Sequence, residues 1–563
     1  MKPAHEKYIP FVPLKMARRA WPDRELKAPP VWCSVDLRDG NQALIDPMNV
    51  REKLELFHTL VDIGVKEIEV GFPSASETEY EFIRTLIEGG HIPDDVTIQV
   101  LVQAREHLIR RTFEAIDGAK HVIFHFYNST STLQRKVVFH TDVEGVKKIA
   151  VDAARLIREL SQPALDAGMD LRYEYSPESF MGTEMDAAVE ICQAVIEAIG
   201  ATPERKVILN LPTTVENCMP NYFADEIEYF ISRLPGRDRA IISLHPHNDR
   251  GEGVATAELG LLAGAERVEA TLFGNGERTG NVDMVTLALN LYTQGVDPKL
   301  DFSDINKIRD VYERVTKMKI GERQPYVGEL VFTAFSGSHQ DAINKGTRYM
   351  EESGTEYWEV PYLPIDPADV GRQYEPIIRI NSQSGKGGSA FVMQHSFGFD
   401  LPKAMHPEFG HIVQVETDRV GKELKPNAIY DLFKAHYIDA VKPYQLVQHS
   451  FAEFTDEEGH SHVTFAGAIR HTDTVFQVQG SGNGPIDAFF NAIHGQKMDR
   501  FTFIDYKEHA VKQGSDSQAV AYIHLQDENG RDWFGVGMSH NINLAPLKGI
   551  LSAINRAVNH DGK

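Results

Sequence analysis

The chain has 563 residues, of which 42% are hydrophobic and 25% are charged, a composition typical of a globular protein with two to four domains. Its net charge of −23, from 58 basic and 81 acidic residues, argues against binding to nucleic acids or to anionic membrane surfaces. No apolar run approaches the roughly 20 residues that a membrane-spanning helix requires.

The N-terminal stretch and the cysteines indicate a reducing compartment. Residues 1–30 are polar and proline-rich and lack the apolar segment of a secretory signal, so we expect an N-terminal extension and a cytoplasmic protein. Cys33, Cys192 and Cys218 are widely spaced without a CxxC pair. This disfavours both a disulfide framework and a structural zinc site.

Residues 31–322 predict an α/β domain of the TIM (β/α)8 barrel class. Short apolar runs alternate with longer amphipathic stretches; the runs are residues 32–37, 67–71, 98–102, 121–127, 171–175, 207–211, 240–244 and 267–272. In the first gap, Leu54, Phe57 and Val61 share one helical face and Gly64 marks the helix end. Eight strand–helix units indicate a barrel. A doubly wound open sheet is the alternative, but it usually carries a glycine-rich phosphate loop where this chain has LRDGNQ (37–42).

The remaining residues predict two further regions. Residues 323–444 mix helical segments with loops rich in Gly, Ser and Pro, which indicates linker subdomains. Residues 445–563 read as two βββα repeats, in which Pro485 aligns with Pro546 and Ala492 with Ala553. We expect a C-terminal α/β regulatory domain, with a ligand site between the repeats as a hypothesis.

Polar side chains follow the predicted strands at the end of the barrel where TIM-barrel chemistry occurs. His245 and His247 lie two residues apart after the seventh strand, so both imidazoles share a face and can reach one metal ion. Asp39 after the first strand and Asn281 after the eighth would complete a mixed nitrogen and oxygen set, which suits Mg²⁺, Mn²⁺ or Zn²⁺. Arg38 can stabilise a developing oxyanion, or it can simply pair with Asp39 at the barrel mouth.

Four stretches carry a resemblance to a known family. LRDGNQ (37–42), followed after ten residues by Lys53, and LHPHNDRGEGVA (244–255) resemble motifs of the 2-isopropylmalate/homocitrate synthase family. NSQSGKGG (381–388) and DVGRQYE (369–375) extend the similarity over nearly the whole chain, and the N-terminal extension resembles the longer subtype. The resemblance implies an acyltransferase that condenses acetyl-CoA with a 2-keto acid, with Mg²⁺ as the expected metal and K⁺ as an open question.

The resemblance also implies residue roles. Asp39, His245, His247 and Asn281 match the metal ligands, and Arg38 matches the oxyanion-stabilising arginine. His339, acting with Glu178, is our choice of base, and either Tyr374 or an acid linked to the metal would protonate the new alkoxide. His339 and Tyr374 match residues that the linker region supplies to the partner subunit's site, so a homodimer is expected. The substrate-binding positions are Leu101, His125, Tyr127, Ser176, Thr214 and Glu277.

The keto acid follows from the lining of that pocket. None of the matched positions is a fixed cation, which disfavours 2-oxoglutarate and favours the apolar side chain of 2-oxoisovalerate. Pyruvate is harder to exclude, because an apolar pocket rejects a shorter substrate by only about 1–3 kcal/mol. The expected product is 2-isopropylmalate, for leucine biosynthesis. Alternatives are citramalate or homocitrate synthesis, an HMG-CoA-lyase-like reaction on the same metal set, and a non-catalytic amino-acid sensor.

For the C-terminal repeats, the resemblance implies feedback inhibition by leucine bound between them. Gly480, Gly482, Gly535 and Gly537 lie where strand meets helix in each repeat. Glycine permits close approach of the backbone to a ligand, but tight turns explain these positions equally well.

Overall fold

The computed structural model describes residues 3–334, 336–374, 388–420, 424–438, 440–455, 461–494, 498, 500–511 and 517–561. Most of the NSQSGKGG stretch, at 381–387, therefore lies outside the described residues. The chain forms two compact units, Met1–Phe332 with Pro364–Gln373 and Thr333–Leu363 with Tyr374–Lys563. Across the described ranges, no helix is both long enough and apolar enough to cross a membrane.

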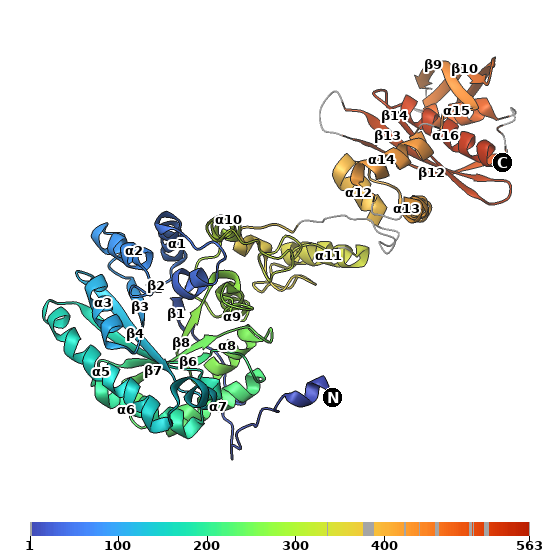
Figure 1. The fold of residues 1–563 in the computed structure, drawn as a ribbon. Helices are drawn as coiled ribbons and strands as arrows, with labels where there is room; N and C mark the ends of the chain where they lie inside the picture. Colours follow the sequence, from blue (N-terminus) through green and yellow to red (C-terminus); the bar gives the residue numbers. More distant parts are fainter. Residues whose placement is uncertain are drawn as a thin grey trace. The chain divides into compact units, whose positions relative to one another are not determined.

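The first unit is a closed barrel of eight parallel strands in sequence order, which confirms the predicted fold class (Figure 1). The strands are β1 (Val31–Ser34), β2 (Glu67–Gly71), β3 (Thr97–Gln103), β4 (His121–Ser129), β5 (Asp170–Glu178), β6 (Val207–Thr213), β7 (Ala240–Pro246) and β8 (Arg267–Ala270). The pairing of β1 with β8 closes the barrel. Strands β2, β6 and β8 are buried at every residue, as parallel strands are when helices cover their outer face.

Helices surround this barrel (Figure 1). They are α1 (Val50–Ile63), α2 (Glu77–Glu88), α3 (Glu106–Ile116), α5 (Val143–Asp166), α6 (Met185–Ile199), α7 (Pro220–Arg233), α8 (Gly253–Leu262), α9 (Met284–Tyr292) and α10 (Ile305–Thr316). Helix α1 ends at Gly64, whose φ of 106° is left-handed as the sequence predicts. Its buried face centres on Leu56, Phe57 and Leu60, so Leu54 and Val61 are half-buried flanking residues.

The N-terminal extension is attached to α7 by charged hydrogen bonds. Arg19 donates two hydrogen bonds to the carboxylate of Asp225, at 2.7 and 2.8 Å, and the Trp21 indole donates a third at 2.9 Å. The backbone N–H of Ala20 donates to the carboxylate of Glu228. The extension is therefore part of the first unit.

The second unit contains helices followed by the predicted pair of βββα repeats. The helices are α11 (Gly337–Ser353), α12 (Gly388–Phe397), α13 (His406–Val420) and α14 (Pro426–Phe433). The first repeat is β9 (Tyr444–Thr455), β10 (Ser461–His471), β11 (Thr474–Gly482) and α15 (Pro485–Ile493). The second is β12 (Phe501–Ala510), β13 (Ala519–Asp527), β14 (Asp532–Ser539) and α16 (Leu544–Asp561). Each set of strands forms an antiparallel three-stranded sheet.

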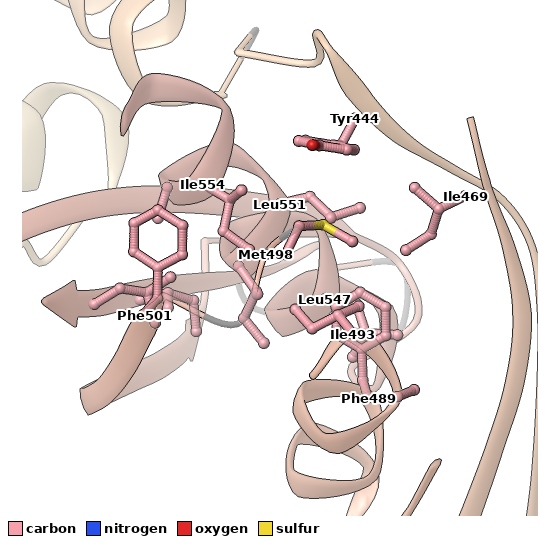
Figure 2. Packing of buried hydrophobic residues seen from close by; sticks show 14 of the residues in the cluster. Tyr444, Ile469, Phe489, Ile493, Met498, Phe501, Leu547, Leu551 and Ile554 are labelled. Atoms are coloured by element: carbon pink, nitrogen blue, oxygen red, sulfur yellow. The ribbon is translucent and has the colours of Figure 1, made fainter. Parts of the chain in front are cut away.

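One hydrophobic core joins the two repeats. Phe489 and Ile493 of α15 belong to the same buried cluster as Leu547, Leu551 and Ile554 of α16 (Figure 2). Strand residues from both sheets complete it, among them Val463, Phe465, Ile523 and Leu525. Because the cluster draws on both repeats, neither repeat buries its apolar face alone.

The glycines singled out in the repeats lie within strands rather than in turns. A Cβ atom at Gly480 of β11 would lie 2.4 Å from the backbone nitrogen of Ala492, and one at Gly535 of β14 would lie 2.2 Å from the carbonyl oxygen of Gly549. Gly482 and Gly537 meet α15 and α16 in the same way. The missing side chains therefore let each helix approach its sheet closely, and the explanation by tight turns is wrong. A role in ligand binding stays a prediction.

We expect Gly535→Ala to destabilise the second unit by about 1–3 kcal/mol, because the added methyl group must push α16 off β14. Calorimetry of the full chain should show a lowered unfolding transition. Gly484→Ala is the matched control, since a Cβ there meets nothing within 4 Å. Equal transitions for the two variants would contradict the close-packing explanation.

Candidate active site and metal centre

The predicted site residues of the barrel converge on one cavity at the carboxyl ends of the strands. The cavity has a volume of about 220 Å³. Its lining includes Arg38, Asp39, Leu101, His125, Tyr127, Ser176, Glu178, Thr214, His245, His247 and Glu277. Every predicted substrate-binding position therefore lies at this cavity.

The predicted metal ligands come from three strand ends. A π-helical turn over Asp36–Gly40 follows β1 and presents Asp39, whose Oδ2 atom lies 3.4 Å from Nε2 of His245 and 3.8 Å from Nε2 of His247. An isolated bridge pairs His247 with Asn281, which brings Asn281 beside them. The Asn281 side chain donates a hydrogen bond of 2.8 Å to Oδ2 of Asp39.

This donor set fits a divalent metal ion. One carboxylate oxygen and two imidazole nitrogens lie within 4.8 Å of one another, which is close enough for a single ion. Among the four predicted ligands, two buried atoms, Nδ1 of His247 and Oδ1 of Asn281, have no hydrogen-bond partner among the described residues. Orphaned buried acceptors of this kind are expected where a ligand completes the coordination.

The surroundings keep the carboxylate of Asp39 ionised and shift the pKa values of His245 and His247 in opposite directions. Burial alone would raise the pKa of Asp39, but Arg38 and His245 hold it well below its usual range. Burial likewise opposes the charge of His245, yet hydrogen bonds to Asp39 and Glu269 raise its pKa to about 9. Burial and the neighbouring His245 lower the pKa of His247 to about 3, so this imidazole is neutral and available to a metal.

Glu269 of β8, which the sequence analysis did not single out, orients His245. Its fully buried carboxylate accepts hydrogen bonds from Nδ1 of His245 at 2.7 Å, from Gln99 at 2.7 Å and from Asn210 at 2.8 Å. The Nδ1 bond leaves Nε2 of His245 directed at Asp39. A carboxylate behind a histidine fixes the ring and raises its basicity toward a metal.

The sequence does contain a pattern from which Glu269 could have been predicted. Polar residues interrupt apolar strand runs at Glu67 and Glu69 of β2, Gln99 of β3, Glu174 of β5 and Arg267 and Glu269 of β8. In a strand whose outer face is covered by helices, such residues have only the barrel interior in which to pair.

Arg38 pairs with Asp39, as one of the two hypotheses for it predicts, and its role in stabilising an oxyanion stays a prediction. Its Nη1 atom donates to Asp39 at 2.7 Å and its Nε atom donates to Glu69, so it does pair with the acid beside it. It also lines the cavity, where its cationic edge can face a bound oxyanion. Gln42 donates to Asp39 at 2.9 Å and to Glu277 at 3.3 Å. It thereby links Glu277, a predicted substrate-binding residue, to the predicted metal ligand Asp39.

The remaining pocket residues form a hydrogen-bonded wall. Nε2 of His125 and the hydroxyl of Ser176 are 2.8 Å apart, and the other ring nitrogen lies 2.7 Å from Glu69. The hydroxyl of Thr214 accepts from the backbone N–H of Ser179 at 2.9 Å.

Burial raises the pKa of Glu178, while Arg38 acts against this rise. A carboxylate with a raised pKa is suited to proton transfer near neutral pH.

Arg278, a second arginine that lines the cavity, was not among the residues predicted from the sequence either. Its guanidinium is bound to Asp249 at 2.6 Å and to the carbonyl oxygen of Thr214 at 2.6 Å. Both arginines that line the cavity are thus paired with carboxylates.

His339 and Tyr374 belong to the second unit, not to the barrel. His339 lies on α11 and stacks on Tyr362, with ring centroids 4.1 Å apart. The hydroxyl of Tyr374 is buried without a hydrogen-bond partner among the described residues, and burial raises its pKa.

Family patterns match the chain along most of its length. The pattern described as HMGL-like matches residues 29–312, the alpha-isopropylmalate synthase post-catalytic domain-like pattern matches residues 329–394, and the LeuA allosteric (dimerisation) domain matches residues 423–558. A protein of Clostridium acetobutylicum named 2-isopropylmalate synthase is 53% identical over 98% of this chain and 99% of its own. The chain belongs to the 2-isopropylmalate synthase family.

Other relatives agree with this assignment. Proteins of Brucella suis and Rhizobium meliloti with the same name are 53% and 52% identical, and they cover 99% and 100% of this chain and of their own lengths. Membership in the 2-isopropylmalate synthase family leaves the lyase-like, citramalate, homocitrate and sensor alternatives unsupported. It also makes the chain an acyltransferase.

We expect Glu269→Gln to weaken divalent-metal binding about 10–100-fold, because a neutral amide orients His245 less well and lowers its basicity. Calorimetric titration of metal-free protein with Mn²⁺ measures this directly. Glu204→Gln, at an exposed glutamate away from the cavity, is the control for the loss of one negative charge. Unchanged affinity in a folded Glu269→Gln variant would remove Glu269 from the metal site.

Proposed function

We propose that the barrel cavity condenses acetyl-CoA with 2-oxoisovalerate and that hydrolysis then yields 2-isopropylmalate and CoA, for leucine biosynthesis in the cytoplasm. The observation that carries the proposal is the cluster of Asp39, His245 and His247 inside this cavity, in a chain of this family.

A divalent metal, Mg²⁺ in our proposal with Mn²⁺ and Zn²⁺ as alternatives, would be held by Asp39, His245, His247 and Asn281 and would supply Lewis acidity at the keto carbonyl. Arg38 would stabilise the negative charge that develops on the same oxygen. Ser176, Thr214 and His125 would orient the keto acid, while Leu101 and Tyr127 contact its side chain.

Proton transfer completes the mechanism. His339, with Glu178, would take the proton from the acetyl methyl group, and the resulting enolate attacks the keto carbon. Tyr374 would protonate the new alkoxide, and water then cleaves the thioester, which makes the reaction irreversible. His339 and Tyr374 would reach the site from the partner subunit of a homodimer, in keeping with the match to a dimerisation domain.

The charges at the cavity support the choice of keto acid. A second carboxylate, as in 2-oxoglutarate, needs a cation of its own. Arg38 is already paired with Asp39 and Glu69, and Arg278 is paired with Asp249. An apolar side chain avoids this requirement, which favours 2-oxoisovalerate over 2-oxoglutarate.

The test is CoA release from acetyl-CoA with 2-oxoisovalerate, pyruvate or 2-oxoglutarate, in the presence of Mg²⁺ or Mn²⁺. We expect 2-oxoisovalerate to give the highest kcat/KM, because its side chain fills the apolar pocket that pyruvate leaves partly empty, a difference of about 10–200-fold. EDTA should abolish the rate and added metal should restore it. A preference for either other acid would refute the pocket assignment, and absence of CoA release with all three would refute the reaction.

We further propose that leucine binds the C-terminal repeats and inhibits the enzyme. Millimolar leucine should lower the rate and should raise the unfolding transition of the second unit, because a ligand stabilises the folded state that binds it. Alanine at the same concentration is the control. An unchanged rate together with an unchanged transition would refute the proposal.

A further inference from the structure

The chain leaves the first unit at two places. Thr333–Leu363 and the chain from Tyr374 onward belong to the second unit, whereas Pro364–Gln373 between them belongs to the first. The segment after the first exit carries His339, and the segment after the second exit begins with Tyr374. Both residues proposed to transfer protons from the second unit therefore follow closely on these exits.

The residues before the first exit form a loop bonded to α9. The side chain of Gln324 donates a hydrogen bond of 2.8 Å to Asp283, the residue that caps this helix. The hydroxyl of Tyr326 donates to the side chain of Asn290 at 2.7 Å. Phe332, the last residue before the exit, is buried. The chain is thus held on the first unit up to the exit itself.

The residues before the second exit pack beside the start of α10. Val370 is fully buried. Gly371 has a left-handed φ of 69°, and a Cβ atom there would lie 2.3 Å from the carbonyl oxygen of Ser303. The backbone N–H of Arg372 donates to the carbonyl oxygen of Pro367 at 2.9 Å. This short segment is therefore fixed in place and is not a free linker.

The side chain of Arg372 joins the two exits. Its Nη1 atom donates to the carbonyl oxygens of Val327 at 3.0 Å and Gly328 at 2.8 Å, and Nη2 donates to that of Glu329 at 3.4 Å. Its guanidinium carbon lies 5.1 Å from the ring centre of Phe332. A planar guanidinium can bond several carbonyl groups at once. We call these contacts the Arg372 clasp.

The chain between the clasp and the two proposed proton-transfer residues is short. Tyr374 comes two residues after Arg372, so their Cα atoms are at most about 7 Å apart. His339 comes seven residues after Phe332, which limits that separation to about 25 Å. Because both tethers are short, a shift of one exit relative to the other changes how His339 and Tyr374 can be placed together.

We propose that the Arg372 clasp positions His339 and Tyr374 as a pair, so that both reach one cavity of the partner subunit. This inference rests on the proposed condensation and on the proposed roles of these two residues in it. Arg372 is a positioning residue in this arrangement. It acts through His339 and Tyr374 and does not contact the reacting atoms.

Arg372→Met tests the proposal, because methionine can still contact Phe332 but donates no hydrogen bond. We expect kcat to fall about 10–100-fold, since a small displacement of a base has effects of this size. KM for 2-oxoisovalerate should change less than twofold, and the affinity for Mn²⁺ should stay the same. Arg233→Met is the matched control, because exposed Arg233 on α7 lies over the ring of Tyr229 at 5.4 Å.

An isotope effect separates positioning from a general loss of structure. Trideuterated acetyl-CoA should lower kcat/KM by a larger factor in Arg372→Met than in the unsubstituted chain, because a displaced base slows removal of the methyl proton. Partial unfolding would instead lower the rate equally for both isotopes. Arg372→Lys, which keeps the charge but lacks the planar guanidinium, should show the same change to a smaller degree.

A double variant shows whether Arg372 acts through the base. His339→Gln removes the proposed base, so removal of the methyl proton then limits the rate. Adding Arg372→Met to this variant should lower kcat less than twofold further, because the two residues serve one step and their effects are not additive.

Hydrogen exchange provides a readout that does not depend on turnover. The backbone N–H of Gly328 donates to the carbonyl oxygen of Gln324 at 2.9 Å within the loop that Arg372 contacts. In Arg372→Met, peptides that cover residues 322–332 should exchange about fivefold faster or more, because the loop loses the hydrogen bonds from the guanidinium. Arg233→Met should leave the exchange of these peptides unchanged.

Three results would overturn the inference: unchanged exchange over residues 322–332 in Arg372→Met, equal isotope effects in this variant and in the unsubstituted chain, or losses of the two single variants that multiply in the double variant. Failure of the proposed function is distinguishable, because the unsubstituted protein would then release no CoA with any keto acid, whatever the exchange of the loop shows.

Discussion

The whole site depends on a set of charges buried in the interior of the barrel. Arg267 is fully buried and contacts Glu67 at 2.6 Å, Glu269 at 3.2 Å and Glu174 at 3.3 Å. Charges removed from water in this way must be paired, because an unpaired buried carboxylate costs several kcal/mol. Glu269 is hydrogen-bonded to His245, and Glu69 is hydrogen-bonded to His125 and Arg38. Charged residues in the barrel interior therefore position the side chains that line the cavity, in addition to the loops at the strand ends.

The barrel fold explains why these residues meet. The carboxyl ends of parallel strands lie at one end of the barrel, so Asp39 after β1 and His245 at the end of β7 become neighbours although they are far apart in sequence. The same geometry could be predicted from the alternation of apolar runs and from the HxH spacing. Gly64 likewise ended the first helix as its conformational freedom suggests.

Other parts could not be predicted from the sequence because they depend on packing in three dimensions. Glu269 reads as one polar residue in an apolar run, and only strand register reveals that it contacts His245 and Asn210 together. The glycines of the repeats are explained by contacts with α15 and α16 that no local pattern encodes. Arg372 reads as one basic residue of the DVGRQYE stretch, and only the fold reveals that it bonds the carbonyl oxygens of Val327 and Gly328.

We propose that Asp39, His245 and His247 hold a divalent metal that also binds the keto acid. The most direct measurement is electron paramagnetic resonance of Mn²⁺ added to metal-free protein, with and without 2-oxoisovalerate, in the unsubstituted chain and in Asp39→Asn. We expect bound Mn²⁺ whose spectrum changes when the keto acid is added, and loss of that bound signal in Asp39→Asn. A bound signal that survives Asp39→Asn, or a spectrum that the keto acid leaves unchanged, would contradict it.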